Sequence, residues 1–161
     1  MGKIVIRLVG IDGIKNMGWV DEGNIVRGAQ PEVPKGYNTI KSFGYKTVIN
    51  LRKFHDDTII VKSIGLKSFQ FPMTVFHSLK SYEITKILAI LLSPKYFPIF
   101  IHCQQGHDRT GAICACYRLI QGWSMTEVLE ELEMYGYNSL WTEMKETIVD
   151  FAKSQGIEVK E

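Results

Sequence analysis

The chain has 161 residues, of which 45% are hydrophobic and 22% charged, and this composition excludes a disordered, collagen-like or disulfide-dense chain. Its 19 Lys and Arg against 17 Asp and Glu leave a net charge of +2, which argues against nucleic acid or an anionic membrane as a bulk partner. The longest apolar run, residues 87–92, is far shorter than the roughly 20 residues that span a bilayer. We therefore expect one domain over residues 1–161 without a membrane span and, because no signal peptide is visible, a cytoplasmic protein.

Strand-like and helix-like segments alternate through the chain. In order, the patterns predict a strand over residues 3–9, a glycine-rich loop over 10–23, a strand over 24–27, a helix over 35–43, a strand over 46–51, a helix over 56–64 and a strand over 66–71. An amphipathic helix over 79–92, a buried strand over 99–101 and helices over 108–121, from 124 and over 139–154 follow. This alternation predicts an α/β domain with a central, mostly parallel sheet of four or five strands and helices on both faces.

The three cysteines are Cys103, Cys114 and Cys116, an odd number without the spacing of a disulfide framework. Cys114 and Cys116 lie two residues apart on a predicted helix, so they point to nearly opposite faces of it. They form neither a redox CxxC pair nor a zinc motif, and Cys103 remains as the cysteine in a chemically distinctive setting.

Residues 99–120 (IFIHCQQGHDRTGAICACYRLI) place Cys103 and Arg109 in one short loop between a buried strand and a helix. Ligands in open α/β sheets bind at the carboxyl ends of strands, where this loop lies. Inward-pointing loop N–H groups, the helix N-terminus and the guanidinium fork of Arg109 together bind an anion. The same positive field favours the thiolate of Cys103. One loop therefore offers a nucleophile and an oxyanion cradle, as displacement at phosphorus requires.

This pattern of His-Cys, five residues and Arg-Thr-Gly resembles the signature of the cysteine-dependent protein tyrosine and dual-specificity phosphatases. Residues 23–52, FPM at 71–73 and PIFIHC at 98–103 are similar to the atypical dual-specificity group of plants, fungi and bacteria, or to its tyrosine-phosphatase-like phytase branch. The resemblance covers about residues 23–123 and implies a phosphatase with no metal or other cofactor, because Arg109 and the loop amides neutralise the transferring group.

The resemblance also implies residue roles. Cys103 would attack phosphorus and form a phosphocysteine, Arg109 would bind the phosphoryl oxygens, and Thr110 would hydrogen-bond the departing thiolate. His102 would orient the loop and tune Cys103. The remaining residues expected to contact substrate are Gln104, Gln105, Gly106 and His107 in the loop, with Arg52 and Lys53 after the strand over 46–51.

The expected general acid is missing from its usual place. Related phosphatases carry an Asp where this chain has Met73, and a thioether cannot donate a proton. Asp108 is the first candidate for the acid, with an equally weighted structural role as a partner of loop amides. Asp56 and Asp57 are rivals that also fit a solvated helix start, and His77 is a weaker candidate.

The leading interpretation is a phosphomonoester hydrolase. A phosphate-binding pseudophosphatase and a rhodanese-like sulfurtransferase are the alternatives, and the loop length together with Arg109 favours phosphate. The substrate is either phosphotyrosine, phosphoserine or phosphothreonine on a protein, or an inositol polyphosphate, and both classes stay open at this point. We expect a monomer with no nucleic-acid partner.

Overall fold

A six-stranded mixed sheet forms the centre of the computed structural model, which describes residues 3–159. The strands lie in the order β1-β2-β3-β6-β4-β5, with β3, β6, β4 and β5 parallel and β1 and β2 added antiparallel at one edge. They are β1 (Arg7–Leu8), β2 (Met17–Asp21), β3 (Ile25–Gly28), β4 (Thr47–Arg52), β5 (Lys67–Met73) and β6 (Ile99–His102). The central strand β6 therefore ends between two parallel neighbours, and whatever follows it lies at the middle of the sheet edge.

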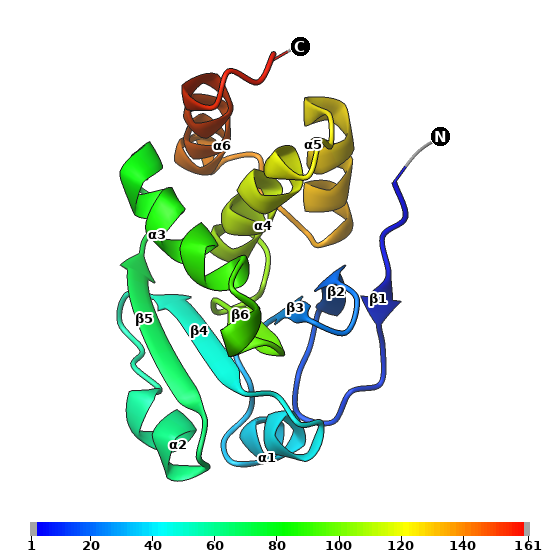
Figure 1. Cartoon of the computed structure of the whole chain (residues 1–161), viewed down its shortest axis with the longest axis vertical. Coiled ribbons are helices and arrows are strands. Elements are labelled where there is room, and N and C mark those ends of the chain that lie inside the picture. The colour runs from blue at the N-terminus through cyan, green and yellow to red at the C-terminus, as the bar shows by residue number, and fades with distance from the viewer. Residues whose placement is uncertain (1–2, 160–161) are drawn as a thin grey trace.

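Helices cover both faces of this sheet, and Figure 1 shows α3 to α6 grouped on one side, with α1 and α2 on the other. The helices are α1 (Lys35–Ser42), α2 (Thr58–Ser63), α3 (Ser81–Leu91), the 3-10 helix η1 (Pro94–Tyr96), α4 (Arg109–Ile120), α5 (Met125–Met134) and α6 (Thr142–Ser154). Ser124 caps α5 by accepting from the N–H of Glu127, as its capping box predicts. Within residues 3–159, no helix is long and apolar enough to cross a membrane.

The predicted α/β class with helices on both faces is confirmed, but the count of four or five strands is wrong. The strand expected over residues 3–9 shortens to Arg7–Leu8, and the segment 10–23, expected to be a loop, contains β2. β2 pairs antiparallel with β3, and Gly18 lies opposite Arg27. A side chain at Gly18 would overlap the hydroxyl of Tyr135, so this glycine marks close packing inside a strand instead of a turn.

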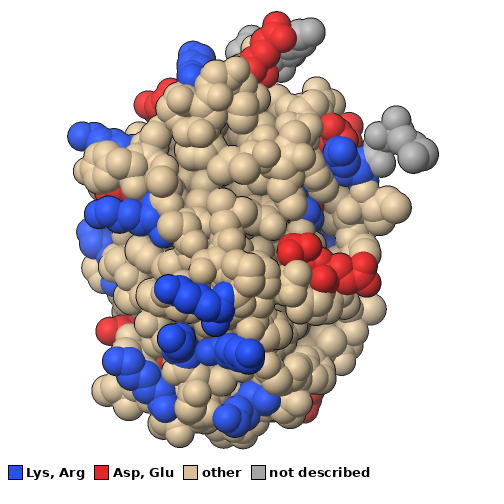
Figure 2. All heavy atoms as spheres, viewed as in Figure 1, with Lys and Arg blue, Asp and Glu red and all other residues tan. Residues whose placement is uncertain are grey.

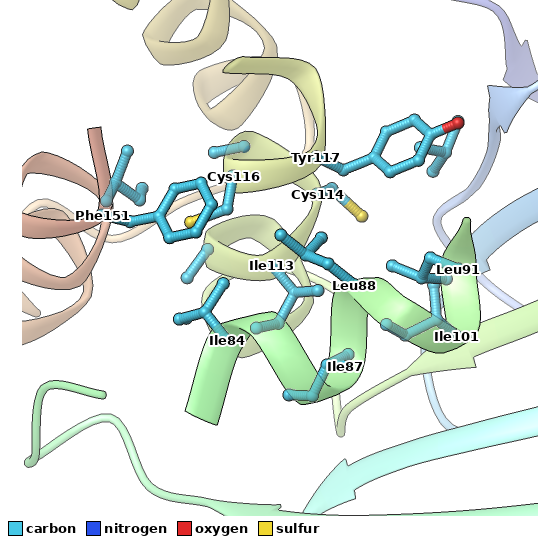
Figure 3. Close-up of a cluster of buried hydrophobic side chains, with 14 of the residues drawn as sticks. Ile84, Ile87, Leu88, Leu91, Ile101, Ile113, Cys114, Cys116, Tyr117 and Phe151 are labelled. Atoms are coloured by element: carbon cyan, nitrogen blue, oxygen red, sulfur yellow. The ribbon is translucent and has the colours of Figure 1, made fainter. Parts of the chain in front are cut away.

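The larger core lies between the sheet and α3 to α6. Figure 3 shows Ile84, Ile87, Leu88 and Leu91 of α3 against α4, with Phe151 of α6 on the far side. In the same view, the thiols of Cys114 and Cys116 point to opposite sides of α4. Both are fully buried, and burial raises the pKa of Cys114 to about 11. These two cysteines point to opposite faces of the helix, as their spacing predicts, and both are core residues.

The net charge of +2 conceals an uneven distribution. Residues 33–107 contain ten Lys and Arg against three Asp and Glu, whereas residues 108–161 contain five against ten. On the face shown in Figure 2, basic side chains gather over the lower half, where α1 and α2 lie. The middle segment of the chain, residues 33–107, is therefore basic and the C-terminal segment, residues 108–161, is acidic.

Candidate active site

The loop between β6 and α4 lies at the carboxyl ends of the parallel strands, as predicted. It borders a pocket of about 190 Å³. The lining residues are Val75, Cys103, Gln104, Gln105, His107, Asp108, Arg109 and Trp141. A larger groove of about 630 Å³ runs along α5 and α6 and contains none of the predicted site residues, so the smaller pocket is the candidate active site.

Four consecutive carbonyl groups of the loop are held from outside it. The donors and acceptors are His102 Nδ1 to Cys103 O (3.1 Å), Gln30 N to Gln104 O (2.9 Å), Asn16 Nδ2 to Gln105 O (3.1 Å) and Arg27 Nη2 to Gly106 O (2.9 Å). In a trans peptide the N–H points away from the preceding C=O. The N–H groups of residues 104–107 therefore point toward the opposite, inner side, where they form an anion cradle.

The loop can follow this path only because residue 106 is a glycine. Gly106 has φ +74°, a conformation that other residues rarely adopt. A Cβ on it would lie 2.8 Å from the backbone C and O of Gly28 and 3.0 Å from the N of Ala29. The cradle is thus packed directly on the end of β3.

Cys103 is 2% exposed at the bottom of the pocket, at the start of this cradle. The hydroxyl of Thr110, in the first turn of α4, is buried and has no hydrogen-bond partner within residues 3–159. Buried hydroxyls without a partner are uncommon, and a substrate or an ionised sulfur would supply one. This arrangement supports the role that the family resemblance implies for Thr110.

Two arginines approach the cradle. Arg109 opens α4 and donates from Nη1 to the carbonyl oxygen of Met73 at 3.3 Å, so the FPM segment lies beside the loop as predicted. Met73 supplies a backbone carbonyl there and no acid. Arg52, at the end of β4, is half-buried, and burial and the charge of Arg109 lower its pKa while Cys103 acts in the opposite direction. Arg52 is therefore near enough to interact electrostatically with Cys103 and Arg109, although it is not among the residues that line the pocket. Lys53 is exposed and lies over the ring of Phe54.

Asp108 lines the pocket and is half-buried. Its Oδ1 accepts a hydrogen bond of 2.9 Å from the backbone N–H of Asn138, in the segment between α5 and α6. Within residues 3–159, Oδ2 has no hydrogen-bond partner, so one carboxylate oxygen is anchored and the other is available to a substrate. Asp108 thus makes a structural contact, to the segment between α5 and α6 instead of the loop amides or the nearby base that were expected, and its role as an acid stays a prediction.

The rival acids lie elsewhere. Asp57 is 2% exposed and does not line the pocket; its carboxylate accepts from Tyr37, His102 and Asn50 beneath the loop. Asp56 is exposed and accepts from the N–H of Thr58 at the start of α2. These positions remove Asp57 from contact with a leaving group and leave Asp56 as a helix-start residue.

His77 is likewise exposed and pairs with Thr74 at 3.0 Å, outside the pocket lining. His107 does line the pocket, with its ring against Gly136. Residues 3–159 contain no group of three or more His, Cys, Asp and Glu side chains placed to hold a metal ion.

Sequence reasoning missed several residues that build the site. Arg27 is 1% exposed, stacks 3.6 Å above the Tyr135 ring, and has no carboxylate at ion-pair distance among residues 3–159. Its charge beneath the loop is therefore met by the Tyr135 ring and the carbonyl of Gly106 instead of a carboxylate. Trp141 and Val75 form pocket walls. An arginine inside an apolar strand such as β3 was the one signal that could have been read from the sequence.

Comparison with known proteins agrees with this geometry. A model of the tyrosine phosphatase family matches residues 14–160. The inositol diphosphatase SIW14 of Saccharomyces cerevisiae is 36% identical over 81 residues, which are 48% of this chain and 29% of that protein. The inositol diphosphatase DSP4 of Arabidopsis thaliana is 30% identical over 133 residues, 74% of this chain and 63% of that protein. The chain therefore spans less than two thirds of these relatives.

Solved structures share the fold. The core catalytic domain of the PP-IP phosphatase SIW14 from S. cerevisiae, in complex with citrate, has a TM-score of 0.70 and 25% identity, covering 88% of this chain and 93% of that chain. TpbA of P. aeruginosa has a TM-score of 0.72 at 22% identity, covering 84% of each chain. The six-stranded sheet and its helical layers are thus an architecture already seen in other proteins.

Proposed function

Because this chain belongs to the tyrosine phosphatase family, whose model matches residues 14–160, we propose that it is a cysteine-dependent phosphatase acting through a phosphocysteine on Cys103. The observation that carries this proposal is the set of four outward-held carbonyls at residues 103–106, because the N–H groups that follow them point to the opposite side, where a phosphoryl group would bind. Arg109 lines the same pocket and would add a bidentate donor to the phosphoryl oxygens. Retention of both Cys103 and Arg109 argues against a pseudophosphatase.

The proposed reaction has two steps. The thiolate of Cys103 attacks phosphorus, the S–P bond forms, and the P–O bond to the leaving group breaks, with the proton for the leaving oxygen coming from Asp108. Water then attacks the phosphocysteine, the S–P bond breaks, and the released thiolate accepts a hydrogen bond from Thr110. Arg109 and the loop N–H groups stabilise the phosphoryl oxygens in both steps.

We propose an inositol phosphate carrying a diphosphate group as the first substrate class. One support is Met73, which leaves Asp108 as the one proposed proton donor, itself held by Asn138. A phosphate leaving group departs as a stabilised anion and needs less protonation than an alkoxide. Arg52 and His107 at the rim suit the neighbouring phosphates, and relatives named inositol diphosphatases fit the same substrate.

Phosphotyrosine is the second candidate, and a different observation favours it. Val75 and Trp141 line the pocket, and Phe76 packs edge-on against Trp141 with ring centroids 5.2 Å apart. Such aromatic walls suit a phenyl ring better than a polyanion.

The test compares kcat/KM for an inositol diphosphate, an inositol phosphate with monoesters only, a phosphotyrosine peptide, para-nitrophenyl phosphate and thiosulfate. Cys103→Ser is the blank, and Trp141→Ala separates the two substrate classes by removing the aromatic wall. We expect the inositol diphosphate to be preferred and to be insensitive to Trp141→Ala. Preference for the peptide, lost in Trp141→Ala, would support phosphotyrosine. Turnover of thiosulfate alone would overturn the phosphatase proposal.

A further inference from the structure

A continuous chain of hydrogen bonds runs beneath the active-site loop from Arg52 to the backbone carbonyl of Cys103. Its links are Arg52 Nη1 to Gln30 Oε1 (3.4 Å), Gln30 Nε2 to Tyr37 Oη (2.6 Å), Tyr37 Oη to Asp57 Oδ2 (2.8 Å), Asp57 Oδ2 to His102 Nε2 (2.9 Å) and His102 Nδ1 to Cys103 O (3.1 Å). Tyr37, Asp57 and His102 are each at most 2% exposed. Water therefore has little access to the middle of the chain.

The direction of the first links is set by groups that can only donate. A guanidinium has no acceptor, so the Gln30 side chain turns its oxygen to Arg52 and its NH2 to Tyr37. The Tyr37 oxygen accepts from Gln30, and its hydroxyl hydrogen then points to Asp57. Burial and the charge of Asp57 raise the pKa of Tyr37, so this phenol keeps its proton at neutral pH.

The orientation of the Asn50 side chain is likewise set by a group that can only donate, a backbone N–H. The backbone N–H of Arg52 donates to Asn50 Oδ1, so Asn50 Nδ2 faces the carbonyl of His55 and Oδ1 of Asp57. Asp57 thus accepts from Tyr37 and from Asn50, and donors of this kind favour the ionised carboxyl group. Burial alone would raise the pKa of Asp57, but the hydrogen bonds and charge of His102 and the two further donors outweigh burial and lower it.

Both ring nitrogens of His102 face oxygen acceptors. The carbonyl of Cys103 has no hydrogen to give, and neither has an ionised Asp57, so Nδ1 and Nε2 must each carry a hydrogen. A neutral imidazole has only one. We propose that Asp57 is a positioning residue that keeps His102 as an imidazolium. That His102 in turn tunes the neighbouring Cys103 is what the family resemblance already implies, and the inference concerns the residue that sets its charge. The inference rests on the proposed role of Cys103 as nucleophile.

Other charges around these groups stay in place when Asp57 is changed. Cys103 is faced by Arg52, Arg109 and the buried thiol of Cys114. Asp57 and His102 are faced by His55 and Asp56 from the segment before α2. Burial and the charge of Arg52 lower the pKa of His55, so this ring is neutral near pH 7 and does not replace His102 as a cation. Replacing Asp57 therefore removes its own charge and that of His102, while Arg52, Arg109 and Asp56 keep theirs.

The experiment measures two quantities on the full chain. The first is the 15N chemical shifts of the His102 ring at pH 7.5, which report whether each nitrogen carries a hydrogen. The second is the pH profile of Cys103 alkylation by iodoacetamide, with Cys103→Ser as the blank. We expect two protonated nitrogens in the wild type. Asp57→Asn should make the ring neutral and move the alkylation midpoint upward by about one pH unit, the smallest effect typical of a close charge.

Two further variants sharpen the test. Tyr37→Phe removes one donor to Asp57 and should move the midpoint in the same direction by less. Asp56→Asn changes the exposed neighbouring carboxylate and should leave both measurements unchanged. If Asp57→Asn does not fold, the wild-type spectrum still decides, because a His102 ring with one protonated nitrogen overturns the proposal. An unmoved alkylation midpoint in folded Asp57→Asn overturns it too.

The outcome is separable from that of the proposed function. Alkylation reports the thiolate without any turnover. A wild-type protein with an imidazolium and a reactive Cys103 that hydrolyses no phosphate ester would refute the phosphatase proposal alone. An active phosphatase with a neutral His102 ring would refute the role of Asp57 alone.

Discussion

Replacing Asp108 with asparagine removes the proposed proton donor but keeps the hydrogen bond that holds this side chain in place. The amide oxygen of the substituted side chain can accept from the N–H of Asn138 as Asp108 Oδ1 does at 2.9 Å. We therefore expect the free energy of unfolding to change by less than about 1 kcal/mol, the usual net value of one hydrogen bond. The amide cannot protonate a leaving oxygen, so the loss appears in catalysis.

The size of that loss depends on the leaving group. Protonation by a general acid contributes about 10²–10⁴-fold, or about 3 to 5 kcal/mol of the barrier, for an alkoxide that leaves poorly. Asp108→Asn should lower kcat by this factor for inositol monoesters and by much less for para-nitrophenyl phosphate or a diphosphate. The limb of the pH profile on which kcat falls with rising pH should flatten for the monoesters.

The assay is steady-state kinetics on the three substrates over a pH series, with Asp56→Asn as the matched control. An equal loss of kcat on every substrate would refute the reasoning, because it would make Asp108 a structural member of the loop. A leaving-group-dependent loss in Asp56→Asn instead would assign the acid to the segment before α2.

Four further outcomes are expected. Cys103→Ser should abolish turnover with the fold intact by circular dichroism, since a serine hydroxyl does not ionise near neutral pH; a tenth of wild-type activity would contradict covalent catalysis. Arg109→Lys should be nearly as damaging in kcat/KM, because the bidentate fork is lost although the charge remains. Hydrogen peroxide should inactivate the enzyme reversibly, with thiol mapping by mass spectrometry finding Cys103 modified before the buried Cys114 and Cys116, whose pKa values burial raises. Gly106→Ala should cost about 1–3 kcal/mol in thermal unfolding for its backbone conformation, more if Gly28 cannot move, and should raise KM for phosphate esters; an unchanged melting temperature would contradict the contact.

The parts of the site that are local in sequence could be predicted from it. The strand, the loop from Cys103 and the helix that opens at Arg109 lie within one segment, and their residue types alone indicate an anion cradle. Elements with strong periodicity, such as α3 and β4, were predicted to within a few residues of their bounds.

The parts that depend on distant segments could not be predicted. Asp57 lies 45 residues before His102, and Arg27 lies 79 residues before Gly106, so neither contact leaves a pattern in the chain. From the sequence, Asp57 fits a solvated helix start, because the helix dipole favours acidic side chains in the first turn. Its actual role, accepting hydrogen bonds from buried groups, leaves no such local pattern. The strand β2 was missed because Gly18 is there to admit Tyr135, a contact that only the folded protein contains.

The hydrogen bonds to the four carbonyls of residues 103–106 have a consequence for how this protein loses activity when it is denatured. Their donors come from the segment before β2, from β3, from the turn before α1 and from β6, so the loop is tied to parts of the chain as far apart as Asn16 and His102. Such a loop cannot melt by itself, because releasing it requires several of these elements to separate together. Heat or urea should therefore abolish catalysis in the same cooperative transition that unfolds the sheet, with no range of conditions in which a folded but inactive protein accumulates.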